Sequence, residues 1–340
     1  MPNSNIASMK DLAKLAACSI STVSKALNGR PDVSEQTRKK ILKIAEAHNF
    51  VPSVFGKDLK RKCTENIGAV FCRREQPLSG NPFYSRVLEG IEAESAINNY
   101  NLILHLLAED KSKLPKMLRE KRVDGVILVG VLDQVVLELV KSVQIPIVLV
   151  DPKIYVDDFN QVLIDNEHGA YQATNYLITH GHRRIGFISG DLDRMSFKQR
   201  FNGCRKALTH NRIEFDDRIV QTGGLEQGYD HAKNLMSLKD RPTAIFSAND
   251  INAILGYKAI KSLQLRIPED ISIIGFDDIE FAKMSSPPLT TIRVYKEEMG
   301  SIAVRLVIEE IEDKSRKSKT MLVPTKLIER ESVKAIERNQ

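Results

Sequence analysis

Tryptophan is absent from this 340-residue sequence, and cysteine is scarce. The four cysteines form no CxxC pair and no spacing typical of zinc ligands; they are Cys18, Cys63, Cys72 and Cys204. The seven histidines include no HExxH pair or similar set. A metal centre and a disulfide framework are therefore both disfavoured, and we expect reduced thiols.

Long apolar runs are also missing. No segment approaches the roughly 20 apolar residues that a membrane span needs, and the N-terminal residues MPNSNIASMKDLAKLA lack the apolar core of an export signal. Three enzyme motifs, G-x-S-x-G, the P-loop and a strand-following G-x-G-x-x-G, do not occur either. We therefore expect a cytoplasmic protein that contacts no membrane, carries no cofactor and is not an enzyme.

Positive charge is concentrated at the N-terminal end of the chain. Residues 1–62 contain 12 Lys and Arg against 5 Asp and Glu, whereas the remainder contains 38 against 39. The net charge of +6 therefore arises in the first fifth of the protein. A basic head on a neutral body is typical of nucleic-acid binding, although a solvated helical face has the same composition.

Hydrophobic periodicity in this head predicts three short helices. In the first, residues 9–16, the side chains of Leu12, Leu15 and Ala16 share one face. A short turn follows, in which Ser19 is a candidate N-cap.

The second predicted helix, residues 20–27, ends at the stop signal Asn-Gly-Arg-Pro. The third opens at Ser34 and ends before the Val-Pro pair at 51–52. Helix, tight turn, helix and helix in this order predict an all-α helix-turn-helix head.

Short apolar runs alternate with amphipathic stretches from Ile67 onward, beginning with IGAVF, VLEGIEAESAI and LILHLL and ending with INAILGYKAIKSLQ and ISIIGF. Such alternation predicts an α/β body of parallel sheets covered by helices on both faces. The body is long enough for two doubly wound lobes. Ligands of such sheets bind at the carboxyl ends of the strands, here in a cleft between the lobes.

These patterns divide the chain into a head, a polar and basic hinge or linker, and a body; their bounds are residues 1–52, 53–64 and 65–340. The helix from Lys296 to Asp313 is expected to cross back and complete the first lobe. The N-lobe would then comprise about residues 65–164 and 292–325, and the C-lobe about residues 165–291 and 326–340.

Several segments, in their order along nearly the whole chain, resemble the LacI/GalR (lactose-repressor/galactose-repressor) family of transcriptional regulators. They are MKDLAKLAACSISTVSKALNGRPDVSEQTRKKI, VPSVFGKDLKRKCTENIG, GHRRIGFISG, SANDINAILG, IIGFDD and PPLTTIR. The resemblance implies a DNA-binding head, a hinge helix, and a periplasmic-binding-protein-like body that binds an effector and dimerises.

The resemblance also implies which residues contact DNA. They are Ser8, Ser19, Ile20, Ser21, Thr22, Ser24, Lys25, Asn28 and Leu59. Ile20 and Ser21 fall where the family reads base edges, and Thr22 and Ser24 fall where it holds phosphates. Lys25 falls at a further position that contacts a base or a phosphate. The alternative for Thr22 and Ser24 is an ordinary polar helix face.

Leu59 matches the hinge leucine that the family inserts into the minor groove, and packing within the linker is the alternative. Gly56 and Ser53 replace the family's usual alanine and asparagine, so we expect the hinge to become ordered only on DNA. Ala17 stands in the turn where the family usually has glycine.

Six residues of the body match effector-binding positions of the family: Phe83, Tyr84, Asp151, Arg200, Asn249 and Asp277. Carboxylate, amide and guanidinium groups together suit neighbouring sugar hydroxyls, because each can form two hydrogen bonds. The alternatives are lobe packing for the two aromatic residues, turn capping for Asp277, and helix capping for Asn249 and its neighbour Asp250. We expect Asp250 to cap and Asn249 to contact the ligand.

The identity of the effector does not carry over from the family. Leu225 stands where one family member stacks its sugar on a tryptophan. We expect a sequence-specific DNA-binding repressor that binds a pseudo-palindromic double-stranded operator as a homodimer, under the control of a sugar or related metabolite. The absence of a leucine heptad in the C-terminal tail favours a dimer over a tetramer.

Three alternatives remain at this stage. The first is a catabolite-type regulator controlled by a partner phosphocarrier protein. The second is a sugar-binding protein without a DNA role, which the basic head and the lack of an export signal disfavour. The third is an enzyme, which no motif supports.

Overall fold

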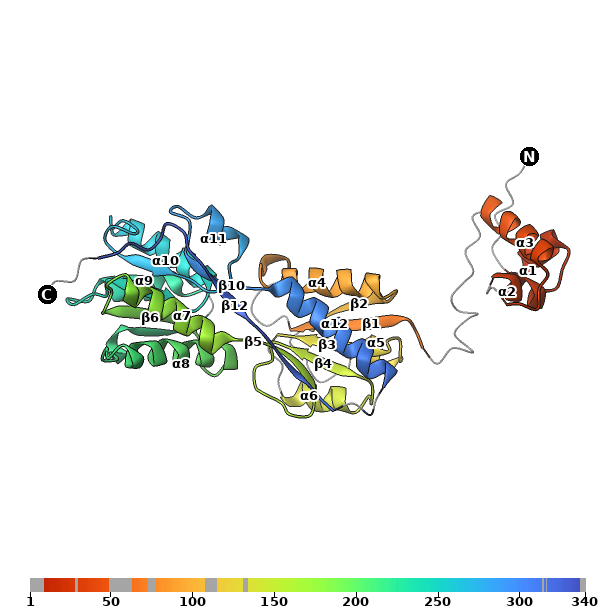
Figure 1. Cartoon of the computed structure of the whole chain (residues 1–340), viewed down its shortest axis with the longest axis horizontal. Coiled ribbons are helices and arrows are strands. Elements are labelled where there is room, and N and C mark those ends of the chain that lie inside the picture. The colour runs from red at the N-terminus through yellow and green to blue at the C-terminus, as the bar shows by residue number, and fades with distance from the viewer. Residues whose placement is uncertain are drawn as a thin grey trace. The chain divides into compact units, whose positions relative to one another are not determined.

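The computed structural model describes residues 9–27, 30–48, 63–72, 78–107, 115–130, 134–224, 226–313, 315 and 317–336. The chain forms two compact units, Met1–Thr64 and Glu65–Gln340 (Figure 1). Each unit has its own hydrophobic core. Several residues singled out from the sequence lie outside the described ranges: Ser8, Asn28, Ser53, Gly56, Leu59 and Leu225.

The head consists of the helices α1 (Met9–Ala16), α2 (Ile20–Leu27) and α3 (Glu35–Ala47). Each helix turns one apolar face inward because its apolar residues recur three or four positions apart. The buried residues of this core are Leu12, Ala13, Ala16, Val23, Ala26, Val33, Ile41 and Ala45. The expectation that Leu15 shares the inward face is wrong, since its side chain is 48% exposed. Ala13 takes its place in the core.

The turn between α1 and α2 contains a residue in the left-handed region. Ala17 has a φ of +53°. The amide of Cys18 donates to the carbonyl of Ala13 at 3.0 Å, and the amide of Ala17 donates to that of Lys14 at 3.2 Å. Together these bonds form a Schellman motif, which normally places glycine at the left-handed position.

The N-lobe of the body contains a six-stranded sheet in the order β11-β5-β4-β3-β1-β2, in which all neighbours are parallel. Its strands are β1 (Asn66–Cys72), β2 (Asn101–Leu107), β3 (Gly125–Val129), β4 (Ile147–Val150), β5 (Asn160–Ile164) and β11 (Thr320–Val323). Two helices cover each face: α4 (Tyr84–Ile97) and α12 (Lys296–Glu312) on one, α5 (Lys116–Arg119) and α6 (Gln134–Lys141) on the other. Because both faces are covered, β3 and β4 are continuous apolar runs.

The C-lobe repeats this arrangement with a four-stranded parallel sheet in the order β7-β6-β8-β9. Its strands are β6 (Ile185–Gly190), β7 (Val220–Gly223), β8 (Ala244–Ser247) and β9 (Ser272–Ile274). The helices α7 (Asn166–Thr179) and α8 (Met195–His210) pack on one face, and α9 (Gly228–Met236) and α10 (Asp250–Ser262) on the other. Shorter elements are the 3-10 helices η2 (Leu78–Gly80) and η3 (Asp217–Ile219), and α11 (Glu280–Met284).

The C-terminal part of the chain connects the lobes. After β10 (Thr291–Val294), α12 packs on β3, β4 and β5 and against α4, and β11 then extends the N-lobe sheet beside β5. The chain returns through β12 (Thr325–Ile328), which is antiparallel to β10. Close packing of α4 and α12 requires glycine, because a Cβ at Gly90 would collide with the carbonyl oxygen of Glu297.

The expected fold class, a helical head and a two-lobed α/β body with parallel sheets, is confirmed. None of the helices in the described part of the chain combines the length and the apolar character needed to cross a bilayer.

Candidate functional site

The start of α2 is the part of the head most clearly arranged for an external contact. Val23 and Ala26 face the core, and Ile20, Ser21 and Lys25 are exposed on the opposite side. Ile20 is 47% exposed although it is a large apolar residue. An exposed apolar side chain at the N-terminal end of a helix, flanked by hydroxyls, suits a surface that meets base edges in a groove.

Ser19 fulfils the capping role expected from the sequence. Its Oγ accepts a hydrogen bond from the Thr22 amide at 3.0 Å and lies 2.8 Å from Thr22 Oγ1. The cap satisfies one of the free amides of the first turn and fixes the direction of α2. Thr22 and Ser24 are half-buried, so each presents part of its surface to solvent.

Lys25 is not isolated on this surface. Its ammonium lies 2.6 Å from a carboxylate oxygen of Asp32, and the hydrogen bond from Lys25 lowers the pKa of Asp32. Both side chains are about half exposed, so the pair is screened and contributes little to stability. The pair places a negative charge beside the one cation of α2 on its exposed side.

In the body, all six residues that match effector-binding positions line one cavity of about 80 Å³. The N-lobe supplies Phe83, Tyr84 and Asp151, and the C-lobe supplies Arg200, Asn249 and Asp277. The cavity also contacts residues that sequence reasoning did not single out: Asn81, Pro152, Lys153, Arg194, Ser196, Phe197 and Ile251. Several of them lie a few residues after the ends of β4, β6 or β8, where the rule that ligands bind at the carboxyl ends of strands could have pointed to them.

On the N-lobe side, Asn81 shapes the entry into α4. Its Oδ1 accepts from the amides of Phe83 and Tyr84 at 3.1 and 3.0 Å. The Tyr84 hydroxyl then donates to Asp151 Oδ2 at 2.9 Å. Burial raises the pKa of Asp151 to about 6, although Arg200 and the bond from Tyr84 act in the opposite direction. Removal from water likewise raises the pKa of Tyr84, so Tyr84 stays a hydrogen-bond donor.

On the C-lobe side, Arg200 is buried and held on several sides. Its Nε donates to Asn166 Oδ1 at 2.8 Å, and its Nη1 donates to the carbonyl of Ala248 at 2.5 Å. The guanidinium carbon lies 3.8 Å from the centre of the Phe276 ring, a stacked cation–π contact. Nη1 also lies 3.1 Å from Asp277 Oδ1.

Asp277 offers the cavity an acceptor that the protein leaves unsatisfied. The side chain is 12% exposed, and Oδ1 receives no hydrogen bond, although it forms the ion pair with Arg200. Burial raises the pKa of Asp277, and the charges of Arg200 and Lys296 limit that rise. A buried acceptor without a donor is costly, so this oxygen is suited to a hydroxyl or amine of a ligand.

Lys296, which sequence reasoning did not select, supports the turn that carries Asp277. It is 5% exposed, and its ammonium donates to the carbonyls of Asp277 at 2.6 Å and of Asp278 and Val294 at 3.2 Å. Asp277 and Asp278 have φ angles of +115° and +50°, which residues other than glycine rarely adopt. The Lys296 donors thus stabilise the strained turn that presents the Asp277 carboxylate.

The neighbouring Asp278 is not among the residues that line the cavity, and it anchors the turn. Its two oxygens accept from Arg330 Nη2 and Arg293 Nε, both at 2.6 Å. Burial favours the neutral acid, but the bonds from the two arginines outweigh it and lower the pKa of Asp278. The carboxylate is therefore ionised and fixed by charge-assisted hydrogen bonds.

The expected roles of Asn249 and Asp250 are partly wrong. Asn249, not Asp250, caps α10: its Oδ1 accepts from the Asn252 amide at 2.8 Å. Asn249 also lines the cavity. Asp250 is fully buried and accepts from Thr291 Oγ1 at 2.6 Å and from the Ile279 amide at 2.9 Å. It thereby connects the loop before α11 with β10.

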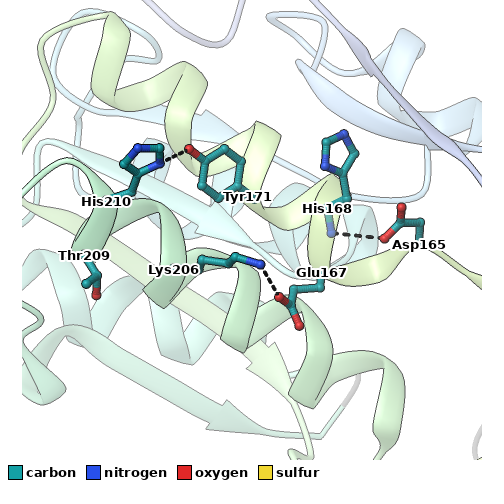
Figure 2. A pocket seen from close by; sticks show the side chains of 7 residues that line it. All are labelled: Asp165, Glu167, His168, Tyr171, Lys206, Thr209 and His210. Atoms are coloured by element: carbon teal, nitrogen blue, oxygen red, sulfur yellow. Dashed lines mark hydrogen bonds and ion pairs between the residues drawn. The ribbon is translucent and has the colours of Figure 1, made fainter.

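A second hollow, of about 750 Å³, lies on the surface of α7 and α8 (Figure 2). Its polar groups already pair with one another: Tyr171 and His210 at 2.6 Å, Lys206 and Glu167 at 3.0 Å. We assign no ligand to it. No cluster of three or more potential metal ligands occurs among the described residues.

Comparison with known proteins gives these two units a family. Residues 8–53 match the family model described as bacterial regulatory proteins, lacI family, and residues 174–333 match the periplasmic binding protein-like domain. The chain is 34% identical to the HTH-type transcriptional repressor PurR of Mannheimia succiniciproducens, over 97% of this chain and 100% of that protein. The chain belongs to the LacI family. The family consists of DNA-binding transcriptional repressors, so the expectation of a regulator rather than an enzyme is confirmed.

Further similar proteins extend the comparison. The ribose operon repressor of Haemophilus influenzae is 34% identical, over 96% of this chain and 99% of that repressor. The solved complex of the transcriptional regulator CelR with cellobiose has a TM-score of 0.74 and 27% identity, over 96% of this chain and 99% of that one. A LacI-family regulator from Enterococcus faecium with bound ribose has a TM-score of 0.71 and 26% identity, over 80% of this chain and all of that one.

Proposed function

We propose that this LacI-family protein is a dimeric, operator-specific repressor whose DNA affinity is set by a small hydroxyl-bearing effector held between its lobes. The observation that carries the proposal is the convergence of Phe83, Tyr84, Asp151, Arg200, Asn249 and Asp277 on one cavity. Solved relatives with cellobiose and with ribose support a carbohydrate as the effector. A cytoplasmic site of action is part of the proposal, and it is supported by the membership of the chain in a family of DNA-binding repressors.

On DNA, Ile20 and Ser21 would meet base edges while Thr22 and Ser24 hold phosphates and Ser19 keeps α2 in place. This assignment is supported by the exposure of the α2 surface and by the Ser19 cap. Lys25 would break its ion pair with Asp32 and contact the duplex instead. Ser8, Asn28 and Leu59 are proposed to complete the contacts on the basis of sequence alone.

Control by the effector would act through the lobes. The cavity of about 80 Å³ is far below the roughly 300–1,000 Å³ of typical ligand sites, so a sugar-sized effector requires the lobes to separate from this arrangement. An effector that prefers one lobe arrangement shifts the population toward it, and a dimer converts that shift into altered head spacing. Two exposed apolar residues of α11, Phe281 and Met284, are candidates for burial in the dimer.

The test of operator recognition is selection of binding sites from a random duplex library, followed by titration of selected and scrambled duplexes. Ile20→Ala should lose most of the preference for the selected duplex, because a base-edge contact contributes only to the specific complex. Leu42→Ala is the matched control, since Leu42 of α3 is 46% exposed. An equal loss in both variants, or no selected sequence at all, would contradict the proposal.

The test of effector binding is a thermal-shift screen of the full chain against sugars, starting with ribose and cellobiose. A ligand that binds only the folded state raises the melting temperature. Arg200→Gln should abolish any shift, whereas Arg205→Gln, on the exposed side of α8, should retain it. A shift that survives Arg200→Gln would place the effector outside this cavity.

A further inference from the structure

The helix α2, which carries the proposed DNA contacts, is short and has few apolar anchors of its own. It has eight residues, of which only Val23 and Ala26 are buried in the core of the head. Isolated helices shorter than about 12 residues are marginally stable, so the position of such a helix depends on its contacts with the rest of the fold. The contacts at the two ends of α2 therefore decide how its exposed side chains are presented.

Lys40 of α3 holds the segment that leads into α2. Its ammonium donates to the carbonyl of Ala16, the last residue of α1, at 3.0 Å. Carbonyls at the C-terminal end of a helix lack partners within the helix and carry partial negative charge, so an ammonium group is favourable there. Only Ala17 and Cys18 separate Ala16 from Ser19, which caps α2. The contact thereby fixes the start of α2 relative to α3.

Arg38 of the same helix holds the segment that follows α2. Its Nη2 donates to the carbonyl of Arg30. The amide of Arg30 donates in turn to the carbonyl of Lys25, in the last turn of α2, at 3.0 Å. Arg30 is thus bound to α2 through its amide and to α3 through its carbonyl. The Nε of Arg38 is shielded from solvent, so this part of the guanidinium faces the interior of the head.

We propose that Arg38 and Lys40 are positioning residues for operator recognition. Together they fix both ends of α2 against α3, and so they determine the angle at which Ile20 and Ser21 are presented to base edges. Neither side chain contacts a base in this role. This inference rests on the proposed function, because it names the residues that orient the same DNA-contacting helix.

A direct contact with DNA phosphates is the alternative role for two cations on a basic head. A phosphate contact contributes to binding of any sequence and releases counterions. Its loss therefore lowers affinity for all duplexes, and it lowers the slope of log affinity against log salt by roughly 0.9. A positioning residue, whose charge stays on a backbone carbonyl, leaves that slope unchanged. Its loss lowers the preference for the operator, because hydrogen bonds to base edges require close alignment.

The experiment removes each donor from the full chain and measures anisotropy titrations of the selected and scrambled duplexes over a series of salt concentrations. The variants Lys40→Met and Arg38→Met lack the donor but keep an unbranched side chain. Each should reduce the ratio of the two affinities about tenfold, the size of one lost base contact, at an unchanged salt slope. Lys40→Arg still offers a donor to the Ala16 carbonyl, so its ratio should stay within about twofold of that of the unmodified chain.

Lys43→Met is the matched control. Lys43 lies three positions after Lys40 on α3, and its side chain is exposed. This variant should keep the preference for the selected duplex. Hydrogen exchange of α1, α2 and α3 shows whether the head of each variant is folded under the binding conditions. If one methionine variant unfolds the head, the other, at the opposite end of α2, decides. Unfolding in both would assign the two residues to stability alone and overturn the inference.

The remaining results separate this inference from the function on which it rests. Equal losses on both duplexes with a lower salt slope would identify phosphate contacts and overturn it. A preference that survives both methionine variants, that falls equally in Lys43→Met, or that Lys40→Arg fails to retain would do the same. In each of these cases the unmodified chain still selects an operator, so the proposed function stands. Failure of the unmodified chain to select any duplex would instead overturn the proposed function.

Discussion

The substitution Ala17→Gly should make the DNA-binding head more stable. Ala17 has a φ of +53° in the turn that ends α1, and it is exposed, so removal of its methyl group loses no packing. The motif is already closed by two backbone hydrogen bonds, from Cys18 to Ala13 and from Ala17 to Lys14. The change therefore affects conformational strain and chain entropy, with little else to alter.

Two opposing contributions decide whether this substitution raises or lowers the free energy of unfolding of the head. A left-handed conformation costs a residue with a Cβ about 1–2 kcal/mol relative to glycine. This gain is reduced by about 0.4–1 kcal/mol, because glycine has more conformational entropy in the unfolded chain. The free energy of unfolding of the head should therefore rise by about 0.5–1 kcal/mol, which corresponds to a two- to fivefold change in the unfolding equilibrium.

Hydrogen exchange of the full chain, read by mass spectrometry, measures this effect within the head alone. Slowly exchanging amides of α1, α2 and α3 should exchange about two to five times more slowly in Ala17→Gly. Arg212→Gly is the matched control, since Arg212 has a φ of +55° after α8 and should slow exchange only in the body. Faster or unchanged exchange of the head in Ala17→Gly would refute the reasoning.

Three further substitutions address charge. Asp32→Asn frees Lys25 and should strengthen operator binding about two- to fivefold at low salt, an advantage that fades as salt rises in an anisotropy titration. Lys296→Met leaves three backbone carbonyls without their donor and should lower the free energy of unfolding of the body by about 2–4 kcal/mol in urea, whereas exposed Lys258→Met should change it by less than about 0.5 kcal/mol. Because burial raises the pKa of Asp151 to about 6, ionisation of Asp151 destabilises the fold as the pH rises through 6. At pH 7, Asp151→Asn should therefore be more stable than the unmodified chain by at most about 3 kcal/mol, and it should melt at a higher temperature. The melting temperatures of the two proteins should become equal near pH 4.

Much of the fold could be predicted because it depends on local patterns. The stop signal after α2, the cap at Ser34 and the alternation of apolar runs with amphipathic stretches are all visible within short windows of sequence. The lengths of short helices are harder to predict from sequence, because the backbone conformation decides where such a helix ends. The short helix α5 extends only over Lys116–Arg119, and Lys121 has a φ of +50° just after it.

The candidate site was predicted less evenly, for a physical reason. The ligand-facing side chains could be named because they stand in segments that resemble the family. Several of these segments follow the carboxyl ends of predicted strands, where ligands of parallel sheets bind. The roles of Asn249 and Asp250 were misjudged because a shift of one residue in the start of α10 exchanges capping for burial. Lys296 could not be recognised at all, since its acceptors are backbone carbonyls brought to it only by the return of the chain into α12.

That same lysine gives a physical link between effector and lobe arrangement. Asp277 presents its carboxylate to the cavity, while its carbonyl accepts from Lys296, the first residue of α12. Because α12 packs on the N-lobe sheet, a displacement of the Asp277 turn in the C-lobe changes the position at which α12 leaves β10. The turn has two positive φ angles and is held by Arg200, Lys296 and the arginines that bind Asp278, so its position is coupled to all of these contacts. A ligand that contacts Asp277 therefore acts at the connection on which the relative positions of the two lobes depend.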